Sequence, residues 1–149
     1  MSKEIRIRKG LDIKIFGEAE KVYSSVKPAK KYVVKPTDFH SLTPKMVVKE
    51  GEKVMAGSIL FYDKYNERIK FCSPVSGQVI EIKRGAKRKI LEVVIDADLE
   101  IDYKKFDIPL NKLSRKNIID LMLEGGVWPF IRQKPYDIIA NPDDMPKAI

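Results

Sequence analysis

The sequence contains one cysteine, Cys72, and one histidine, His40, among its 149 residues. A single cysteine cannot form an intrachain disulfide, so nothing in the chain requires an oxidising compartment. The two residues also cannot supply the ligands of an ordinary structural zinc site, a cysteine-ligated iron–sulfur cluster or a haem held on both sides. No Gly-x-Gly-x-x-Gly fingerprint predicts a dinucleotide-binding turn. We therefore expect this chain to hold no redox cofactor by itself.

Long hydrophobic runs are also missing. No window approaches the roughly 18 apolar residues of a transmembrane helix, and the segment Met1–Lys9 is too charged for a secretory signal. These absences favour a cytoplasmic location. The composition that remains, 44% hydrophobic and 34% charged, is typical of a globular protein. The length predicts one domain, or one domain with a small appendage.

Short strands separated by glycine and proline turns dominate the first two thirds of the chain. Alternating or continuous apolar runs predict strands at residues 5–7, 11–15, 32–34, 69–72, 79–82 and 90–95. Gly51 and Gly57 are expected at tight turns, and Pro74 presets a turn that Gly77 completes. This pattern favours a small sandwich or barrel over repeated strand–helix–strand units.

The last third has a different pattern. Ser114 predicts a helix cap, and apolar residues at helical spacing predict a helix over Arg115–Glu124, ended by Gly125-Gly126. The prolines that follow predict an extended tail without a closing element. We therefore expect a β domain over residues 1–100, then a helix and extended tail over residues 101–149 that lead into a longer protein.

The stretch Val48–Ile82 resembles the biotinyl/lipoyl hammerhead, or barrel-sandwich hybrid, in the order of its glycines, apolar residues and Ser-Pro-Val-Ser-Gly turn. The resemblance implies a mainly β fold with minor α, in which added N-terminal strands and a C-terminal helix extend the hammerhead. Carrier domains of this fold attach lipoate or biotin to a lysine at a hairpin tip. Lys64 lies near that tip, but Glu67 occupies the expected position. A carrier domain stays an alternative.

Several separated motifs extend the resemblance over the whole chain. They are Lys9–Ile15, Leu42–Gly51, Leu60–Lys64, Arg84–Arg88, Glu124–Arg132 and Pro146–Ile149. With these motifs in this order, the sequence is similar to the N-terminal third of the NqrA family, which supplies one subunit of the sodium-translocating NADH:quinone oxidoreductases. A related electron-transport subunit of the Rnf complex shares the hammerhead, but the opening and the Trp128–Arg132 stretch favour the NqrA family.

This resemblance implies a peripheral subunit on the cytoplasmic side of the inner membrane. It implies five partner subunits in a complex of six that oxidises NADH, reduces ubiquinone or a related quinone, and exports sodium. Flavins and iron–sulfur centres would belong to the partners, whereas this subunit would be associated with the quinone. The resemblance thus implies an enzyme activity that belongs to the complex and not to the isolated chain.

A quinone site needs an apolar slot, a stacking aromatic ring and donors to the carbonyl oxygens. Trp128, Phe130 and Arg132 could supply these features, and so could Phe39 with His40. The alternative interpretation is that Trp128 and Phe130 pack in the core and that Phe39-His40 is an ordinary loop.

A predicted turn at residues 83–89 carries five basic residues and accounts for much of the net charge of +8. Such a turn could be merely solvated, or it could contact nucleic acid, anionic lipid head groups or an acidic partner subunit. A nucleic-acid-binding module remains an alternative, but the sequence lacks interleaved aromatics or a helix-turn-helix pattern. We predict a docking surface for a membrane or a partner subunit, made of Lys83, Arg84, Lys87, Arg88 and Lys89.

Overall fold

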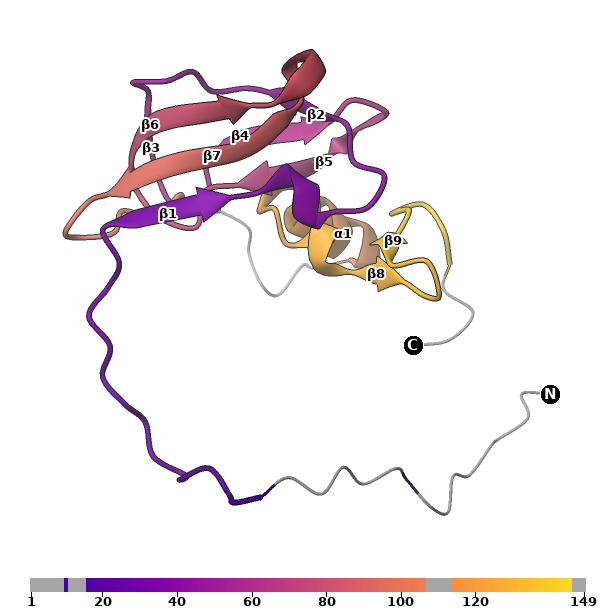
Figure 1. Cartoon of the computed structure of the whole chain (residues 1–149). Helices are drawn as coiled ribbons and strands as arrows, with labels where there is room; N and C mark the ends of the chain where they lie inside the picture. The colour runs from indigo at the N-terminus through magenta and orange to yellow at the C-terminus, as the bar shows by residue number, and fades with distance from the viewer. Residues whose placement is uncertain (1–9, 11–15, 107–113, 146–149) are drawn as a thin grey trace.

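A computed structural model describes residue 10 and residues 16–106 and 114–145. Two antiparallel sheets lie against each other, with a helical segment and a short hairpin below them (Figure 1). The first sheet has the strand order β1 (Lys31–Val34), β7 (Ile90–Ala97), β6 (Gly77–Arg84) and β3 (Lys53–Val54). The second has the order β2 (Pro44–Met46), β4 (Ile59–Asp63) and β5 (Asn66–Cys72). The mainly β class predicted from the sequence is confirmed.

The core lies between these sheets and is built from the inward-facing residues of the strands. Phe61 is completely buried and stacks on Phe71 with 4.7 Å between ring centroids. Val79, Val93 and Ile95 close the core from the first sheet with no exposed surface. Because side chains alternate between the faces of a strand, Val93 and Ile95, two residues apart in β7, lie on the same inward face.

Most predicted strands are confirmed, although several are longer than their apolar runs. The runs at 32–34, 69–72, 79–82 and 90–95 lie in β1, β5, β6 and β7. Both predicted turn glycines have positive φ, +86° at Gly51 and +93° at Gly57. The short strands β2 and β3 were not predicted. The predicted strands at 5–7 and 11–15 lie outside the described residues.

The predicted helix is confirmed as α1 (Arg115–Glu124). The Ser114 side chain accepts a hydrogen bond from the Asn117 backbone N–H at 3.2 Å, which satisfies one free donor of the first turn. At the other end, Gly126 adopts φ +70°, and the Val127 N–H donates back to the Met122 carbonyl at 2.9 Å. This arrangement is a Schellman cap.

After α1 the chain forms structure that the prolines did not indicate. A 3-10 turn, η4 (Trp128–Phe130), leads into a hairpin of β8 (Arg132–Gln133) and β9 (Ile138–Ile139) within the predicted extended tail. Pro135 lies in the turn between the two strands, where no ladder donor is needed. Leu123 and Trp128 join the core of the β-sandwich. No helix in the described ranges has the length and apolar character needed to span a membrane.

Candidate functional site

The fold brings together three of the five residues predicted to contact a quinone. Phe39 caps the 3-10 turn η1 (Pro36–Asp38), Phe130 is the last residue of η4, and Arg132 begins β8. The Arg132 guanidinium carbon lies 4.6 Å from the centroid of the Phe39 ring, and the Phe39 and Phe130 rings meet edge to face at 6.0 Å. We call Phe39, Phe130 and Arg132 the aromatic–arginine cluster.

The cluster rests on the hydrophobic core but opens to solvent. Phe39 meets Phe71 edge to face at 4.7 Å, and Phe71 stacks on the buried Phe61. Phe130 is 71% exposed. The cluster thus combines a ring anchored by the core, a ring that is free on the surface and a cation beside the anchored ring.

Asp137 holds the arginine of this cluster, a role that the sequence did not reveal. Arg132 Nη1 donates to the Asp137 carbonyl oxygen at 3.1 Å and lies 3.4 Å from its carboxylate. Lys134 Nζ donates to the same carboxylate at 2.7 Å. This hydrogen bond lowers the pKa of Asp137, and the nearby charges of Arg132 and His40 lower it further. The carboxylate therefore stays ionised and fixes the guanidinium beside Phe39.

Trp128 is placed differently from the other candidates. Its ring is 8% exposed and belongs to the core. Its indole Nε1 donates to the Ala140 carbonyl at 2.7 Å. In this structure Trp128 offers a ligand neither an open ring face nor an unused N–H. The alternative interpretation of core packing thus describes the position of Trp128 but not that of Phe130.

His40 follows Phe39 in the chain and lies on the rim of a hollow that Phe39 also lines. The residue is exposed and forms an isolated β-bridge with Ile138. The hollow has a volume of about 240 Å³ and also reaches a predicted docking residue, Lys89. No signal in the sequence connects these two residues, because only the packing of η1 against β7 brings them together. The other lining residues are Pro36, Thr37, Phe39, Ser41, Leu42, Pro44 and Ile90.

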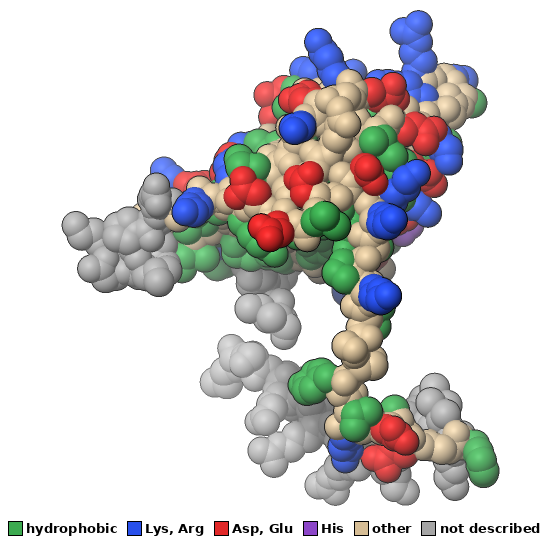
Figure 2. Space-filling view, turned by 90° about the vertical axis from the view of Figure 1, so that its left-hand side faces the viewer, with side chains coloured by type: hydrophobic (Ala, Val, Ile, Leu, Met, Phe, Trp, Pro, Cys, Tyr) green, Lys and Arg blue, Asp and Glu red, His purple; other side chains and the backbone are tan. Residues whose placement is uncertain are grey.

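Of the five cations in the predicted docking surface, one has an ion-pair partner and four have none among the described residues. Lys83 Nζ lies 3.0 Å from the Glu92 carboxylate. That hydrogen bond raises the pKa of Lys83 and lowers the pKa of Glu92. Arg84, Lys87, Arg88 and Lys89 are exposed, and none has an ion-pair partner within the described ranges. Basic side chains project at the top of Figure 2, the end that holds the β6–β7 turn in Figure 1.

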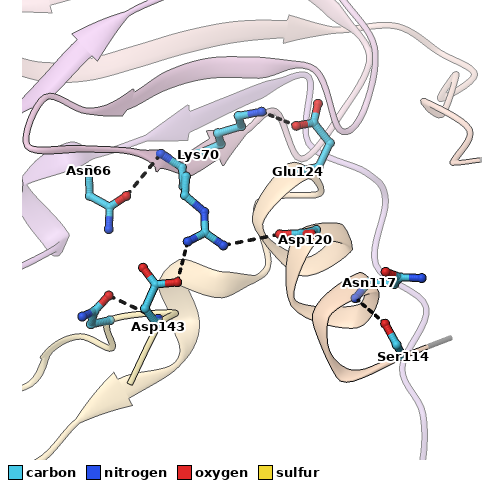
Figure 3. Close-up of polar contacts among 9 residues, drawn as sticks. Asn66, Lys70, Ser114, Asn117, Asp120, Glu124 and Asp143 are labelled. Carbon is cyan, nitrogen blue, oxygen red and sulfur yellow. Dashed lines mark hydrogen bonds and ion pairs between the residues drawn. The ribbon is translucent and has the colours of Figure 1, made fainter. Parts of the chain in front are cut away.

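A second charged region, which the sequence did not reveal, joins β5 to α1. Asp120 and Glu124, four residues apart, lie on the face of α1 that meets β5 (Figure 3). Arg68 lies 3.4 Å from Asp120 and 2.7 Å from Asp143. Lys70 and Lys104 both bind the Glu124 carboxylate, Lys104 at 3.1 Å. The hydrogen bond from Lys70 is the main cause of a lowered pKa of Glu124.

We call this region the β5–α1 seam; it consists of Arg68, Lys70, Cys72, Lys104, Asp120, Glu124, Gly126 and Asp143. Cys72 Sγ lies 3.6 Å from the Glu124 carbonyl oxygen, and burial raises the pKa of the thiol to about 11. Cys72 is therefore a neutral packing residue at physiological pH and not an activated nucleophile. Within the ranges that the structure describes, no group of three or more His, Cys, Asp or Glu residues could hold a metal ion.

Comparison with family models covers almost the whole chain. Residues 5–98 match the model of the NqrA N-terminal barrel-sandwich hybrid domain, and residues 113–149 match that of the NqrA second alpha/beta domain. The chain belongs to the NqrA family. The barrel-sandwich hybrid predicted from the glycine and turn pattern is confirmed by the first match, and the resemblance to the NqrA family is confirmed by both.

Individual relatives agree with this assignment. Three of them, each named as the A subunit of a Na(+)-translocating NADH-quinone reductase, come from Vibrio vulnificus (strain YJ016), Marinomonas sp. (strain MWYL1) and Pseudomonas aeruginosa (strain PAO1). Their identities to this chain are 36%, 35% and 32% in the same order. Each alignment covers 97% of this chain and 33% of the relative. The chain thus spans about a third of the length of the curated relatives it matches.

Proposed function

We propose that this chain is the N-terminal part of an NqrA subunit that works in a Na⁺-translocating NADH:quinone reductase. The observation that carries the proposal is the match of two consecutive family models over residues 5–98 and 113–149. The relatives' shared name supports it. In this proposal the subunit is peripheral, lies on the cytoplasmic side of the inner membrane and contributes to catalysis only within the six-subunit complex.

The proposed division of labour in the complex comes from the family resemblance. It places flavins and iron–sulfur centres in the partner subunits. In this chain, one cysteine and one histidine are too few to ligate an iron–sulfur cluster. The β domain would occupy residues 1–100, and residues 101–149 would begin the next region. The boundaries of the two family matches support this division.

The proposed contact with quinone is the aromatic–arginine cluster. Phe130 has a ring on the surface on which a planar quinone can stack, and the Arg132 guanidinium can donate to a carbonyl oxygen. Asp137 and the Phe39 ring hold that guanidinium in place. Trp128 would support the cluster from the core, and His40 would lie at its edge. Together these residues bind and orient; none performs the redox step.

Copurification tests the assignment to the complex. The full-length protein, tagged at one end, is expressed in its own organism, and membranes are solubilised in mild detergent. We expect the tag to recover NADH:quinone reductase activity that depends on sodium. Recovery of the tagged protein without membrane partners or reductase activity would contradict the proposed function.

Fluorescence titration tests the quinone contact separately. Trp128 is the only tryptophan in the chain and lies two residues from Phe130, so its emission reports on the cluster. A short-chain ubiquinone analogue is expected to quench this emission with saturation. Because stacking is worth about 1 kcal/mol, F130A should weaken binding by about fivefold. Tyr103 is 66% exposed and outside the cluster, so Y103A is the matched control. Equal loss in both variants, or no saturable quenching, would argue against the contact.

The carrier alternative is retained because of one observation. Lys64 is exposed and lies with Tyr65 at the two-residue turn of the β4–β5 hairpin, where carrier domains are modified. Intact mass spectrometry of the protein from cells with active lipoyl and biotin ligases decides the matter. We expect the unmodified mass. An added lipoyl or biotinyl group on Lys64 would favour the carrier function instead.

A further inference from the structure

Three connections of the β-sandwich meet at one of its ends. Val34 of β1 pairs with Val93 near the start of β7, and Pro44 of β2 pairs with Asp63 at the end of β4. The loop after β1, the β4–β5 turn and the β6–β7 turn therefore lie at the same end. The Lys64 N–H donates to the Thr43 carbonyl at 2.9 Å, and Pro44 and Lys89 line one hollow. We call residues 36–44, 63–66 and 84–89 the turn end.

The turn end carries an excess of positive charge. Its sequence holds five lysines and arginines and two carboxylates. One of the carboxylates, Asp63, already accepts a hydrogen bond from the Tyr65 N–H. The other, Asp38, is exposed at the end of η1. Within the part of the chain that the structure describes, no ion pair neutralises Lys64, Arg84, Lys87, Arg88 or Lys89. An anionic partner would supply the missing counter-charge.

The backbone displays these cations on a closed and strained turn. Lys87 and Arg88 both have left-handed φ, 55° and 60°, which costs energy for residues other than glycine. The Gly85 N–H donates to the Lys89 carbonyl at 2.8 Å, and the Lys89 N–H donates to the Ala86 carbonyl at 3.2 Å. Backbone strain of this kind persists only where the surrounding structure holds it, and it clusters at binding and catalytic sites.

The chemistry of the turn end favours a lipid surface over a macromolecule with a shaped interface. A protein interface has an apolar centre, but Ala86 and Tyr65 are the only exposed apolar residues of the turn end. Single-stranded nucleic acid needs aromatic rings along a basic groove. The exposed ring of Tyr65 (79% exposed) lies on a neighbouring turn, and an isolated tyrosine beside cations is typical of the membrane interface.

We propose that the turn end binds the anionic phospholipid head groups of a bilayer, with Arg84, Lys87, Arg88 and Lys89 facing the phosphates. His40 and the hydroxyl residues Thr37 and Ser41, which line the hollow beside Lys89, would add hydrogen bonds to the same phosphates. The proposal deepens the proposed function and rests on it for the presence of a membrane. Vesicle binding is measured without partner subunits, so its failure is distinct from a failure of copurification.

Co-sedimentation with vesicles tests the proposal. The purified 149-residue chain is mixed with vesicles of phosphatidylcholine alone, or with vesicles in which a substantial minority of the lipid is phosphatidylglycerol. We expect binding to the anionic vesicles only, and we expect salt to weaken it. Each basic residue near an anionic surface contributes about fivefold. If the four contributions add, the variant R84Q/K87Q/R88Q/K89Q should bind more weakly by about several hundredfold. Circular dichroism verifies that each variant is folded.

The matched control removes four cations from the opposite end of the sandwich. Lys27, Lys30, Lys31 and Lys53 are exposed, and Lys31 and Lys53 pair with Asp96 and Gln78 at that end. The variant K27Q/K30Q/K31Q/K53Q has the same net charge as R84Q/K87Q/R88Q/K89Q. It should nevertheless bind anionic vesicles within about twofold of the unchanged chain. Equal losses in both quadruple variants would show a nonspecific charge effect and overturn the proposal. Absence of binding to anionic vesicles, or tighter binding to duplex or single-stranded DNA than to vesicles at the same salt concentration, would also overturn it.

Discussion

The β5–α1 seam and the turn end are both rich in lysine and arginine, but their cations have different surroundings. In the seam, Arg68, Lys70 and Lys104 all have carboxylate partners on neighbouring elements. At the turn end, the described residues supply no partner to Lys87 or Arg88. The comparison teaches that a basic residue contributes to the fold where a neighbouring element brings a carboxylate to it, as α1 does for Arg68 and Lys70.

The geometry of the two regions explains this difference. One face of β5 carries every second residue, namely Arg68, Lys70 and Cys72. The helix α1 lies over that face, with Asp120 and Glu124 one helical turn apart. The β6–β7 turn lies at a sheet end, beyond the reach of the helix (Figure 1). Four variants break or sharpen the comparison.

G126A is expected to have the largest effect on stability, because the added methyl group would push α1 away from β5. A Cβ at Gly126 would lie 2.8 Å from Cys72 Sγ and 3.0 Å from the Cys72 backbone nitrogen, at φ +70°. We expect the free energy of unfolding to fall by about 3 kcal/mol, measured by urea denaturation.

Gly51 supplies the control for this prediction. Its φ is +86°, but no atom lies within 4 Å of a Cβ built there. G51A therefore measures the backbone strain alone and should cost about 1 kcal/mol. Equal effects of G126A and G51A would mean that close packing against Cys72 does not hold α1 on β5.

The second effect comes from E124Q, which removes the shared anion of the seam. The folded-state pKa of Glu124 is lowered from an ordinary value of 4.5, so its ionised form stabilises the fold above that pH. This contribution is lost as pH falls through the folded-state pKa. Because the Glu124 side chain is 38% exposed, solvent screens its ion pairs. We therefore expect E124Q to lower the free energy of unfolding by only about 1 kcal/mol at pH 7.

Thermal or urea unfolding from pH 7 to pH 3 checks this prediction. The stability gap between the unchanged chain and E124Q should begin to narrow below about pH 4.5 and close as pH falls through the lower folded-state pKa of Glu124. A gap of constant size from pH 7 to pH 3 would show that the substitution acts through packing and not through charge.

The third effect has the opposite sign and concerns the turn end. K87G relieves the strain of the left-handed backbone at Lys87, but glycine also gives the unfolded chain more freedom, which offsets part of the relief. We expect the free energy of unfolding to rise by a net amount of about 0.5 kcal/mol. K31G, at an exposed strand position, should instead lower stability. Urea midpoints compare the two; a loss of stability in K87G would mean that the lysine side chain stabilises the turn.

The smallest effect is expected when the turn loses its charge. R84Q/K87Q/R88Q/K89Q should change the free energy of unfolding by less than about 0.5 kcal/mol, because these exposed cations have no described partner to lose. R68Q, which removes two ion pairs from the seam, should lower the urea midpoint. If the quadruple variant were the less stable of the two, the contrast between the regions would be wrong.

Local patterns in the sequence predicted much of the fold. Ser114 and Gly125-Gly126 defined both ends of α1, because caps depend on a few neighbouring residues. The apolar runs at 79–82 and 90–95 predicted strands, which the structure shows as β6 and β7. The hairpin of β8 and β9 was missed because two-residue strands are too short to show a period.

The candidate site was only partly predictable. Phe39, Phe130 and Arg132 were selected as chemical types, but two separate motifs in the sequence became one cluster in space. Asp137 was missed because its role depends on the turn that returns it to Arg132. Trp128 had the right chemistry for a ligand and lies in the core instead.

The sequence by itself determined the class of the fold, the caps of α1, the charge of the β6–β7 turn and the family, since each depends on residue types at short spacing or in a fixed order. Only the tertiary structure decided which cations are neutralised and which aromatic rings reach solvent. Lys83 and Arg84 are neighbours in the sequence, yet Lys83 meets Glu92 across the sheet. Cross-strand register and the packing of α1 on β5 set such distances, and both depend on residues far apart in the chain.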